Sequence, residues 1–257
     1  MSSSNAPHSI SSSQNPHFRR WIHLLDSRGT KKFHQFIVFG EKVVRETLFS
    51  LESAPLELVF PVSQPLSFYP PTHVKPYVLV KNLFRQLDIF GTHFPLLICR
   101  TPELPLIDLR ESPQGLEVLC PLSDPSNVGA VIRSCLAFGI HKVIMLQEAS
   151  LPFHPKAVRA SSGAILRQPL FQGPSLDGVI EQSDSKTLVA LDMEGEPLDK
   201  FTWPKNLRLL IGQEGPGLPD PFPFRGLAVP MGSSANSLNA VVAASIALYG
   251  YRLQHPL

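Results

Sequence analysis

The sequence predicts an α/β protein with two domains, the second of which is built on a parallel sheet. The chain has 257 residues and 43% of them are hydrophobic, which is enough to form more than one buried core. Short apolar runs alternate with segments of helical periodicity from residue 17 onward. Between two such series, residues 100–115 contain three prolines and several charges but no sustained period, as is typical of an interdomain linker. We place that linker at residues 105–114.

The first series, residues 17–104, predicts a small α/β domain. Helical spacing of apolar residues and short apolar runs predict helices at 17–28, 41–50 and 82–90 and strands at 36–40, 56–60, 77–80 and 95–99. Residues 1–16 are rich in serine and have almost no apolar content, so we expect them to be disordered. A transit peptide is the alternative for this segment, although no arginine precedes Arg19.

The second series, residues 115–257, predicts a larger α/β domain. The expected strands are 116–120, 142–146, 187–193, 207–212 and 227–231, and the expected helices are 127–139, 154–166, 175–182 and 237–253. Because its strands are continuously apolar and are separated by helices, this domain should hold a parallel sheet that is covered on both faces.

Charge and cysteine usage restrict the class of protein. The net charge is only +2, but residues 17–45 contain seven basic residues against two acids, namely Arg19, Arg20, Arg28, Lys31, Lys32, Lys42 and Arg45 against Asp26 and Glu41. This basic cluster is either a solvated surface or a contact for the phosphate backbone of a nucleic acid. The three cysteines, Cys99, Cys120 and Cys135, lie far apart in apolar surroundings, so neither a disulfide framework nor a metal site is expected.

The chain has no sequence signal for a membrane or for secretion. It lacks a run of roughly 18 apolar residues, and its start lacks the apolar segment of a secretory signal. We therefore expect a soluble protein of the cytoplasm.

Three loops that follow predicted strands carry the chemistry. In a parallel sheet, ligands bind beyond the carboxyl ends of the strands. In the first loop, Asp124 or Ser126 can cap the following helix, which also carries Asn127 and Arg133. Asn127 is either a second cap or a group turned toward the site, and Arg133 is either a solvated position or a functional cation.

The second loop places Gly212, Gly215 and Gly217 around the carboxylate of Glu214. Their order matches neither the dinucleotide fingerprint nor a P-loop. The glycines either let a ligand approach the bare backbone or form a hairpin-like turn.

The third loop, residues 229–239, is rich in polar side chains. Ser237 is the expected N-cap of the last helix, but Ser233, Ser234, Asn236 and Asn239 supply more hydrogen-bonding groups than one cap needs.

Taken in order, these loops resemble the three motifs of a known family. "DPSNVGAVIR", "LLIGQEGPGL" and the segment from "VPM" to "IALY" resemble the motifs of the SpoU/TrmH family of S-adenosylmethionine-dependent RNA ribose 2′-O-methyltransferases, over residues 115–253. The resemblance implies a catalytic domain with a deep trefoil knot, an RNA substrate, and a homodimer whose active site uses both chains. Residues 17–104 then resemble the substrate-binding domain that many members carry in front.

The resemblance also implies roles for individual residues. Arg133 acts at the ribose hydroxyl, and it is positioned by Asn127, Glu214, Ser237 and Asn239. The cofactor adenosine packs against the backbone at Gly212, Val229 and Leu238, with Ile211 and Met231 beside it. Because an arginine side chain loses its proton at neutral pH only at a cost of about 7.5 kcal/mol, we favour a phosphate clamp over a general base for Arg133.

Two other classes of protein stay open from the sequence. One is a non-catalytic RNA-binding protein that keeps the fold, against which the joint presence of all five polar residues argues. The other is a nucleotide-dependent oxidoreductase, against which the missing G-x-G-x-x-G argues. The sequence does not distinguish ribosomal from transfer RNA.

Overall fold

The computed structural model describes residues 6–49, 54–64, 66, 68, 70–215, 217–232 and 237–257, and it divides into two compact units. The first unit contains the chain up to Glu103 together with Phe153–Leu166, and the second contains Leu104–Pro152 and Arg167–Leu257. Segment 153–166 therefore packs with the first unit, whereas the sequence placed it in the second. The reason is aromatic packing, since the ring centroids of Phe153 and Phe36 lie 5.0 Å apart.

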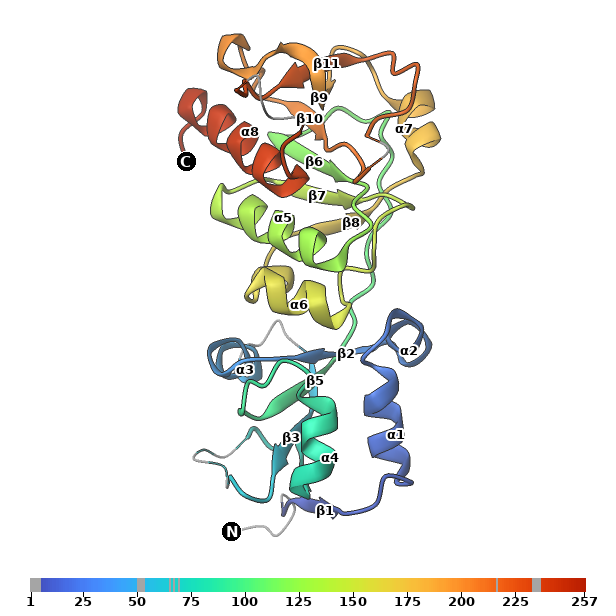
Figure 1. Ribbon diagram of the computed structural model, residues 1–257, viewed down its shortest axis with the longest axis vertical. Coiled ribbons are helices and arrows are strands. Elements are labelled where there is room, and N and C mark those ends of the chain that lie inside the picture. Colours follow the sequence, from blue (N-terminus) through green and yellow to red (C-terminus); the bar gives the residue numbers. More distant parts are fainter. Residues whose placement is uncertain are drawn as a thin grey trace. The chain divides into compact units, whose positions relative to one another are not determined.

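The first unit contains a five-stranded mixed sheet with strand order β1-β4-β3-β5-β2, together with several helices (Figure 1). β4 pairs in parallel with β1 and β3, while β5 pairs antiparallel with β2 and β3. Its elements are β1 (His8–Ile10), α1 (Pro16–His23), α2 (Ser27–Phe33), β2 (Gln35–Val38), α3 (Glu41–Leu48), β3 (Pro55–Pro61), β4 (Lys75–Leu79), α4 (Lys81–Leu87), β5 (Leu96–Arg100), α6 (Pro155–Ser161) and the 3-10 helix η1 (Ala164–Leu166). These elements confirm the small α/β unit that the alternation predicted.

Strand β1 corrects the prediction that residues 1–16 are disordered throughout. Residues 1–5 lie outside the described part of the chain, but His8–Ile10 pairs in parallel with β4. Ile10 is 3% exposed and packs in the same core as Phe18 and Trp21. The burial of Ile10 and the pairing of three residues with β4 therefore order a segment whose composition alone indicates disorder.

The second unit is a six-stranded sheet with strand order β11-β9-β10-β6-β7-β8, in which every pair is parallel. Its elements are β6 (Leu116–Cys120), α5 (Pro125–Ala137), β7 (Lys142–Met145), β8 (Leu170–Gln172), α7 (Leu176–Gln182), β9 (Leu188–Pro197), the 3-10 helix η2 (Leu198–Lys200), β10 (Leu207–Leu210), β11 (Arg225–Ala228) and α8 (Ala240–Gln254). The parallel sheet is confirmed. The sequence missed only β8 among its strands, because three residues are too few for a periodic signal.

Helices cover both faces of this sheet. Leu176 and Val179 of α7 pack in one cluster with Leu119, Ile144 and Leu210 from three neighbouring strands. Since side chains alternate along a strand, the intervening residues point to the opposite face. There α5 and α8 lie side by side (Figure 1).

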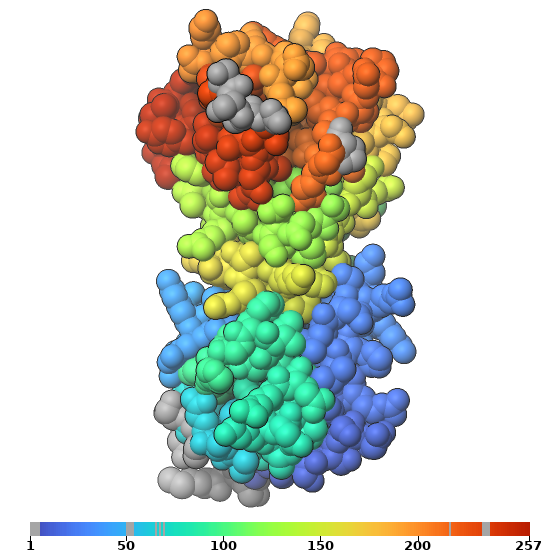
Figure 2. Space-filling view, viewed as in Figure 1, coloured from blue at the N-terminus to red at the C-terminus, as the bar shows by residue number. Residues whose placement is uncertain are grey.

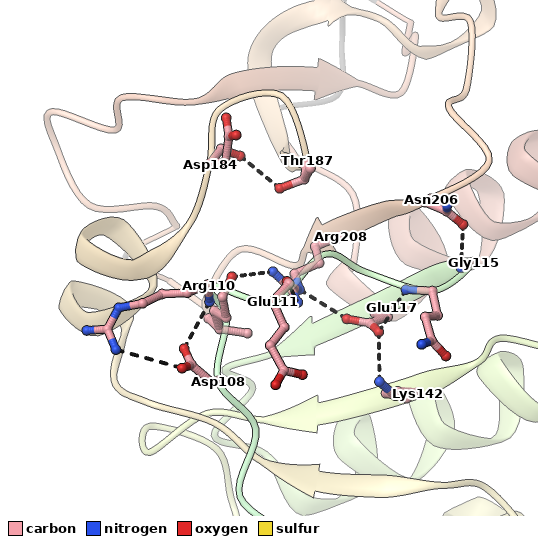
Figure 3. A network of polar contacts seen from close by, with 12 residues as sticks. Asp108, Arg110, Glu111, Gly115, Glu117, Lys142, Asp184, Thr187, Asn206 and Arg208 are labelled. Atoms are coloured by element: carbon pink, nitrogen blue, oxygen red, sulfur yellow. Dashed lines mark hydrogen bonds and ion pairs between the residues drawn. The ribbon is translucent and has the colours of Figure 1, made fainter.

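A charged cluster lies at the amino ends of three adjacent strands on the α7 side of the sheet. Glu117, Lys142 and Arg208 are cross-strand neighbours in the parallel ladder. The Glu117 carboxylate accepts a hydrogen bond from Arg208 Nε at 3.0 Å and lies 3.1 Å from Lys142 Nζ (Figure 3). Glu117 and Arg208 are 0% and 1% exposed. A buried ion pair is stable only if its other polar groups are hydrogen bonded as well, so the terminal nitrogens of Arg208 need acceptors of their own.

Arg208 satisfies those donors with the backbone of the predicted linker. Its two terminal nitrogens donate to the carbonyl oxygens of Leu109 and Glu111 at 2.6 and 2.7 Å. Leu109 is 1% exposed and joins the core beneath α7. Residues 104–111 are thus an integral part of the second unit rather than a free connection, which differs from the predicted linker at 105–114.

The three cysteines lie in the core. Cys99, Cys120 and Cys135 are free and buried. Burial raises the pKa of each thiol, that of Cys120 to about 12. Within the described ranges, no helix combines the length and the apolar character that crossing a membrane requires.

Candidate active site

The loops after β6 and β10 meet at the carboxyl ends of these adjacent strands. The Glu214 carboxylate accepts hydrogen bonds from Ser123 N at 2.7 Å, Ser123 Oγ at 2.9 Å and Asn127 Nδ2 at 2.8 Å. Asp124 caps α5 by accepting from the backbone N–H groups of Ser126 and Asn127. The cap is therefore Asp124, and the Asn127 side chain is turned to Glu214 instead of capping the helix.

The environment of Glu214 favours its ionised form. Partial burial by itself raises the pKa of this carboxyl, but the hydrogen bonds from Asn127, Ser123 and Asp124 outweigh it, so the pKa lies below its usual value. An ionised carboxylate has two oxygens that only accept hydrogen bonds, so it can accept from all these donors at once. Glu214 therefore joins the two loops as an anion at neutral pH.

This link gives a pH-dependent prediction. Because folding lowers the pKa of Glu214, its contribution to stability is present above the unfolded value of 4.5 and is lost as the pH falls through the lowered folded value. We expect Glu214→Gln to lower the free energy of unfolding by about 1 kcal/mol at pH 7, after allowance for solvent exposure, with little difference well below pH 4. Urea unfolding at several pH values measures this. Glu181→Gln, at an exposed position on α7, is the control, and a pH-independent difference would contradict the assignment.

A pocket of about 410 Å³ opens beside this link. It is lined by Ile211, Gly212, Val229, Met231 and Leu238, which are the five predicted cofactor residues, and by Glu214, Ser237 and Asn239. The structure thus brings together eight of the ten residues that the sequence singled out.

The sequence missed the wall contributed by the middle of β9. Leu191, Asp192 and Met193 line the same pocket. The available signal was the polar Asp192 at the end of a continuous apolar run, the same pattern that identified the other loops. Among the described lining residues, Asp192 and Glu214 are the acidic ones.

The glycines of the second loop serve a turn that also walls the pocket. Gln213 and Gly217 exchange backbone hydrogen bonds of 2.9 and 3.1 Å, and Gly215 and Gly217 have φ angles of 85° and 76° that favour glycine. At Gly212, an added Cβ would lie 3.6 Å from the Leu191 carbonyl oxygen, an ordinary contact. The hairpin-like turn is therefore present, and its bare backbone faces the pocket. Pro216 lies outside the described residues.

The third loop needs one correction. The N-cap of α8 is Asn239, whose side-chain oxygen accepts from Val241 N at 2.9 Å and from Val242 N at 3.4 Å, and not Ser237. Ser237 precedes the helix, is exposed and lines the pocket. Ser233, Ser234 and Asn236 lie outside the described residues.

Arg133 lies on α5, the helix that begins after the first loop. It is exposed on α5, six residues after Asn127, which corresponds to about 9 Å along the helix axis. Neither Arg133 nor Asn127 is among the residues that line the pocket. Asn127 is connected to it through a hydrogen bond to Glu214.

The parallel sheet, with a ligand-sized pocket beyond its carboxyl ends, defines an α/β protein that binds a small molecule at the usual place for this class. A family model for the SpoU rRNA Methylase family matches residues 117–249. The chain belongs to this family, which confirms the predicted resemblance.

Individual relatives extend the match over both units. A ribosomal RNA small subunit methyltransferase G 2 from Syntrophobacter fumaroxidans is 42% identical over 244 residues, covering 94% of this chain and 48% of the relative. A 23S rRNA (uridine(2479)-2′-O)-methyltransferase from Streptomyces viridochromogenes is 28% identical over 260 residues, covering 92% and 89%. The chain thus spans about half the length of the first relative and most of the second.

Solved structures show the same fold. An AdoMet-bound rRNA methyltransferase from Sinorhizobium meliloti superimposes with a TM-score of 0.79 at 23% identity, covering 97% of this chain and 98% of that one. The SpoU methyltransferase AviRb from Streptomyces viridochromogenes, in complex with AdoMet, gives a TM-score of 0.78 at 24% identity, covering 94% and 98%. The predicted α/β fold class is confirmed. The trefoil knot stays a prediction.

Proposed function

We propose that this protein is an S-adenosylmethionine-dependent methyltransferase that methylates the 2′-hydroxyl of a ribose in ribosomal or transfer RNA. The observation that carries the proposal is the pocket beyond the carboxyl end of β10 and beside the middle of β9, joined to α5 through Glu214, in a chain of the SpoU family. The ribose specificity is supported by the 2′-O-methyltransferase from Streptomyces viridochromogenes.

The pocket residues fit S-adenosylmethionine in size and chemistry. About 410 Å³ is within the usual range for a small-molecule site. Bare backbone at Gly212 and Gly217 accepts a flat adenine ring, Leu191 and Leu238 supply apolar contact, and Asp192 offers a carboxylate to a cationic ligand. When bound there, the cofactor supplies a methyl group on a positively charged sulfur.

The protein's own residues then align the RNA hydroxyl. Glu214 and Asn127 fix the turn before α5, and this turn sets the position of the helix that carries Arg133. The arginine guanidinium holds the phosphate beside the target ribose and stabilises the developing alkoxide. The hydroxyl proton leaves to water or to a polar neighbour, with Ser237 and Asn239 at the pocket edge.

The first unit is proposed to bind the RNA. Part of the predicted basic cluster is used internally, because Arg20, Lys42 and Arg45 pair with Glu57, Glu46 and Glu41. Arg19, Arg28, Lys31 and Lys32 are exposed on α1 and α2. These four are available to an RNA backbone.

A homodimer is proposed from an apolar stripe on α8, which lies at the surface of the second unit (Figure 2). Val242, Ile246, Tyr249 and Leu253 are 45%, 38%, 55% and 65% exposed and follow one another at helical spacing.

The dimer gives the second prediction. We expect the protein to sediment as a dimer at micromolar concentration and Ile246→Glu to produce a folded monomer without methyl transfer, because the charge cannot be buried in the interface. Analytical ultracentrifugation together with circular dichroism measures this. Glu181→Gln, on α7, is the control. A wild-type monomer with full methyl transfer would refute the shared site.

The proposed function is tested by methyl transfer itself. The protein is incubated with S-adenosylmethionine carrying a labelled methyl group and with ribosomal or transfer RNA that lacks ribose methylation, and the digested nucleosides are separated. A labelled 2′-O-methylnucleoside is expected. RNA binding without label would favour a non-catalytic RNA-binding protein, and label on a base would contradict the ribose specificity.

A further inference from the structure

The first unit has a pocket of its own, far along the chain from the residues of the candidate active site. Its volume is about 670 Å³, and it is formed by β1, by the start of α1 and by the segment that leads into β4. The lining side chains are mainly polar or aromatic and include His8, Asn15, His17, His73, Lys75 and Tyr77. None of the described lining residues is acidic.

The pocket exists because β1 is ordered. The parallel pairing of β1 with β4 places His8 directly beside Tyr77, with ring centroids 5.3 Å apart. His17 of α1 packs on the same tyrosine at 4.9 Å. The two imidazoles therefore stand next to one buried ring, since Tyr77 is 5% exposed, and His8 itself is exposed to an incoming ligand.

The buried carboxylate of Glu57 holds the side chains that surround Tyr77 in place. Glu57 accepts a hydrogen bond from Trp21 Nε1 at 2.7 Å and from the Arg20 guanidinium at 2.6 Å, and its carboxylate lies 3.4 Å from His17 Nδ1. Trp21 in turn meets Tyr77 edge to face at 5.2 Å. Although Glu57 is the ladder neighbour of Lys75, Arg20 balances its charge. The Lys75 ammonium is thus exposed in a pocket whose described lining residues include no acid.

We propose that this pocket is a subsite for one nucleotide of a single-stranded segment of the RNA substrate. An imidazole ring is a surface on which an unstacked base packs, this contact tolerates different bases, and His8 is exposed on top of the buried Tyr77. Lys75 and His73 lie exposed at the rim, where a phosphate can accept hydrogen bonds from both, and Asn15 adds a side-chain amide. The subsite rests on the proposed action on RNA, and it extends RNA capture to the β1 edge of the first sheet.

Two exposed positions test the subsite in the full-length protein. Anisotropy of a short fluorescein-labelled single-stranded RNA is measured over a salt series for Lys75→Gln and His8→Ala. Lys75→Gln should weaken binding and reduce the slope of log affinity against log salt by about 0.7, the value of one phosphate contact. His8→Ala should weaken binding about 10-fold through lost stacking. Lys81→Gln, an exposed lysine at the start of α4 outside the pocket, is the matched control and should bind like wild type.

Photocrosslinking locates the contact independently of affinity. RNA that carries 4-thiouridine should crosslink to peptides within residues 6–17 or 71–77. Crosslinks found only elsewhere, or Lys75→Gln and His8→Ala variants that both bind like Lys81→Gln, overturn the subsite. Displacement of the RNA by micromolar adenosine monophosphate would also overturn it, because the ligand would then be a free nucleotide.

The methyl-transfer assay on the wild-type protein separates the two proposals. If no methyl group is transferred but the two variants weaken RNA binding as expected, the proposed function fails and the subsite stands. If methyl transfer is normal but neither variant changes RNA binding, the subsite fails and the proposed function stands.

Discussion

Replacement of Arg133 by alanine is expected to lower the rate of methyl transfer to RNA by about 100-fold or more. This is the scale observed when one preorganised electrostatic donor is removed from an active site. Arg133 is exposed on α5, so the same change should alter the free energy of unfolding by only a few tenths of a kcal/mol. Single-turnover rates with saturating cofactor, together with urea unfolding, measure the two effects. The control is Arg110→Ala, where the side chain is 74% exposed.

Lysine at position 133 distinguishes the clamp from a proton acceptor. Lysine keeps the positive charge but loses the planar fork and releases its proton more easily. If the arginine clamps a phosphate, Arg133→Lys should stay nearly inactive at every pH while the cofactor still binds. Recovery of most activity with a shifted pH profile would favour the proton acceptor, and normal turnover by Arg133→Ala would refute both roles.

Replacement of Glu117 by alanine is expected to lower the free energy of unfolding by about 3 to 5 kcal/mol, because it leaves the buried guanidinium of Arg208 without its counter-ion. Asp108→Asn is the control in the same cluster (Figure 3). The Asp108–Arg110 pair spans 3.8 Å between exposed side chains, so its loss should cost well under 1 kcal/mol. Urea unfolding measures both variants, and similar losses would show that Glu117 is not a structural anchor.

Most of the architecture could be predicted from sequence because its signals are local. Apolar runs and helical periods identified the parallel sheet of the second unit and the loops at its carboxyl ends. The pairing of β1 with β4 could not be predicted, since it depends on the burial of Ile10 among core residues that lie elsewhere in the chain. The attachment of residues 104–111 was also hidden, because Arg208 reaches their carbonyl oxygens from a strand about 100 residues later.

The same distinction applies to the candidate site. Residue type and loop position were enough to select Glu214 and Asn127, and the structure shows them hydrogen bonded to each other. The N-cap of α8 depends on the residue at which the helix begins. The helix begins at Ala240, two residues later than the expected Ser237 cap would require, so the cap is Asn239. The role of Arg133 was assigned by resemblance, and it stays a prediction.

The position of Glu214 has a thermodynamic consequence for the affinities of the two proposed ligands, cofactor and RNA. This one carboxylate belongs to the loop that walls the pocket, and it also holds the turn from which α5 begins. A ligand that orders the loop therefore also orders the start of the helix that carries Arg133. Coupling between two binding sites is reciprocal. If bound cofactor raises the affinity for RNA by some factor, bound RNA must raise the affinity for the cofactor by the same factor. In the Glu214→Gln variant, both factors should decrease equally and approach 1, which means that neither ligand changes the affinity for the other.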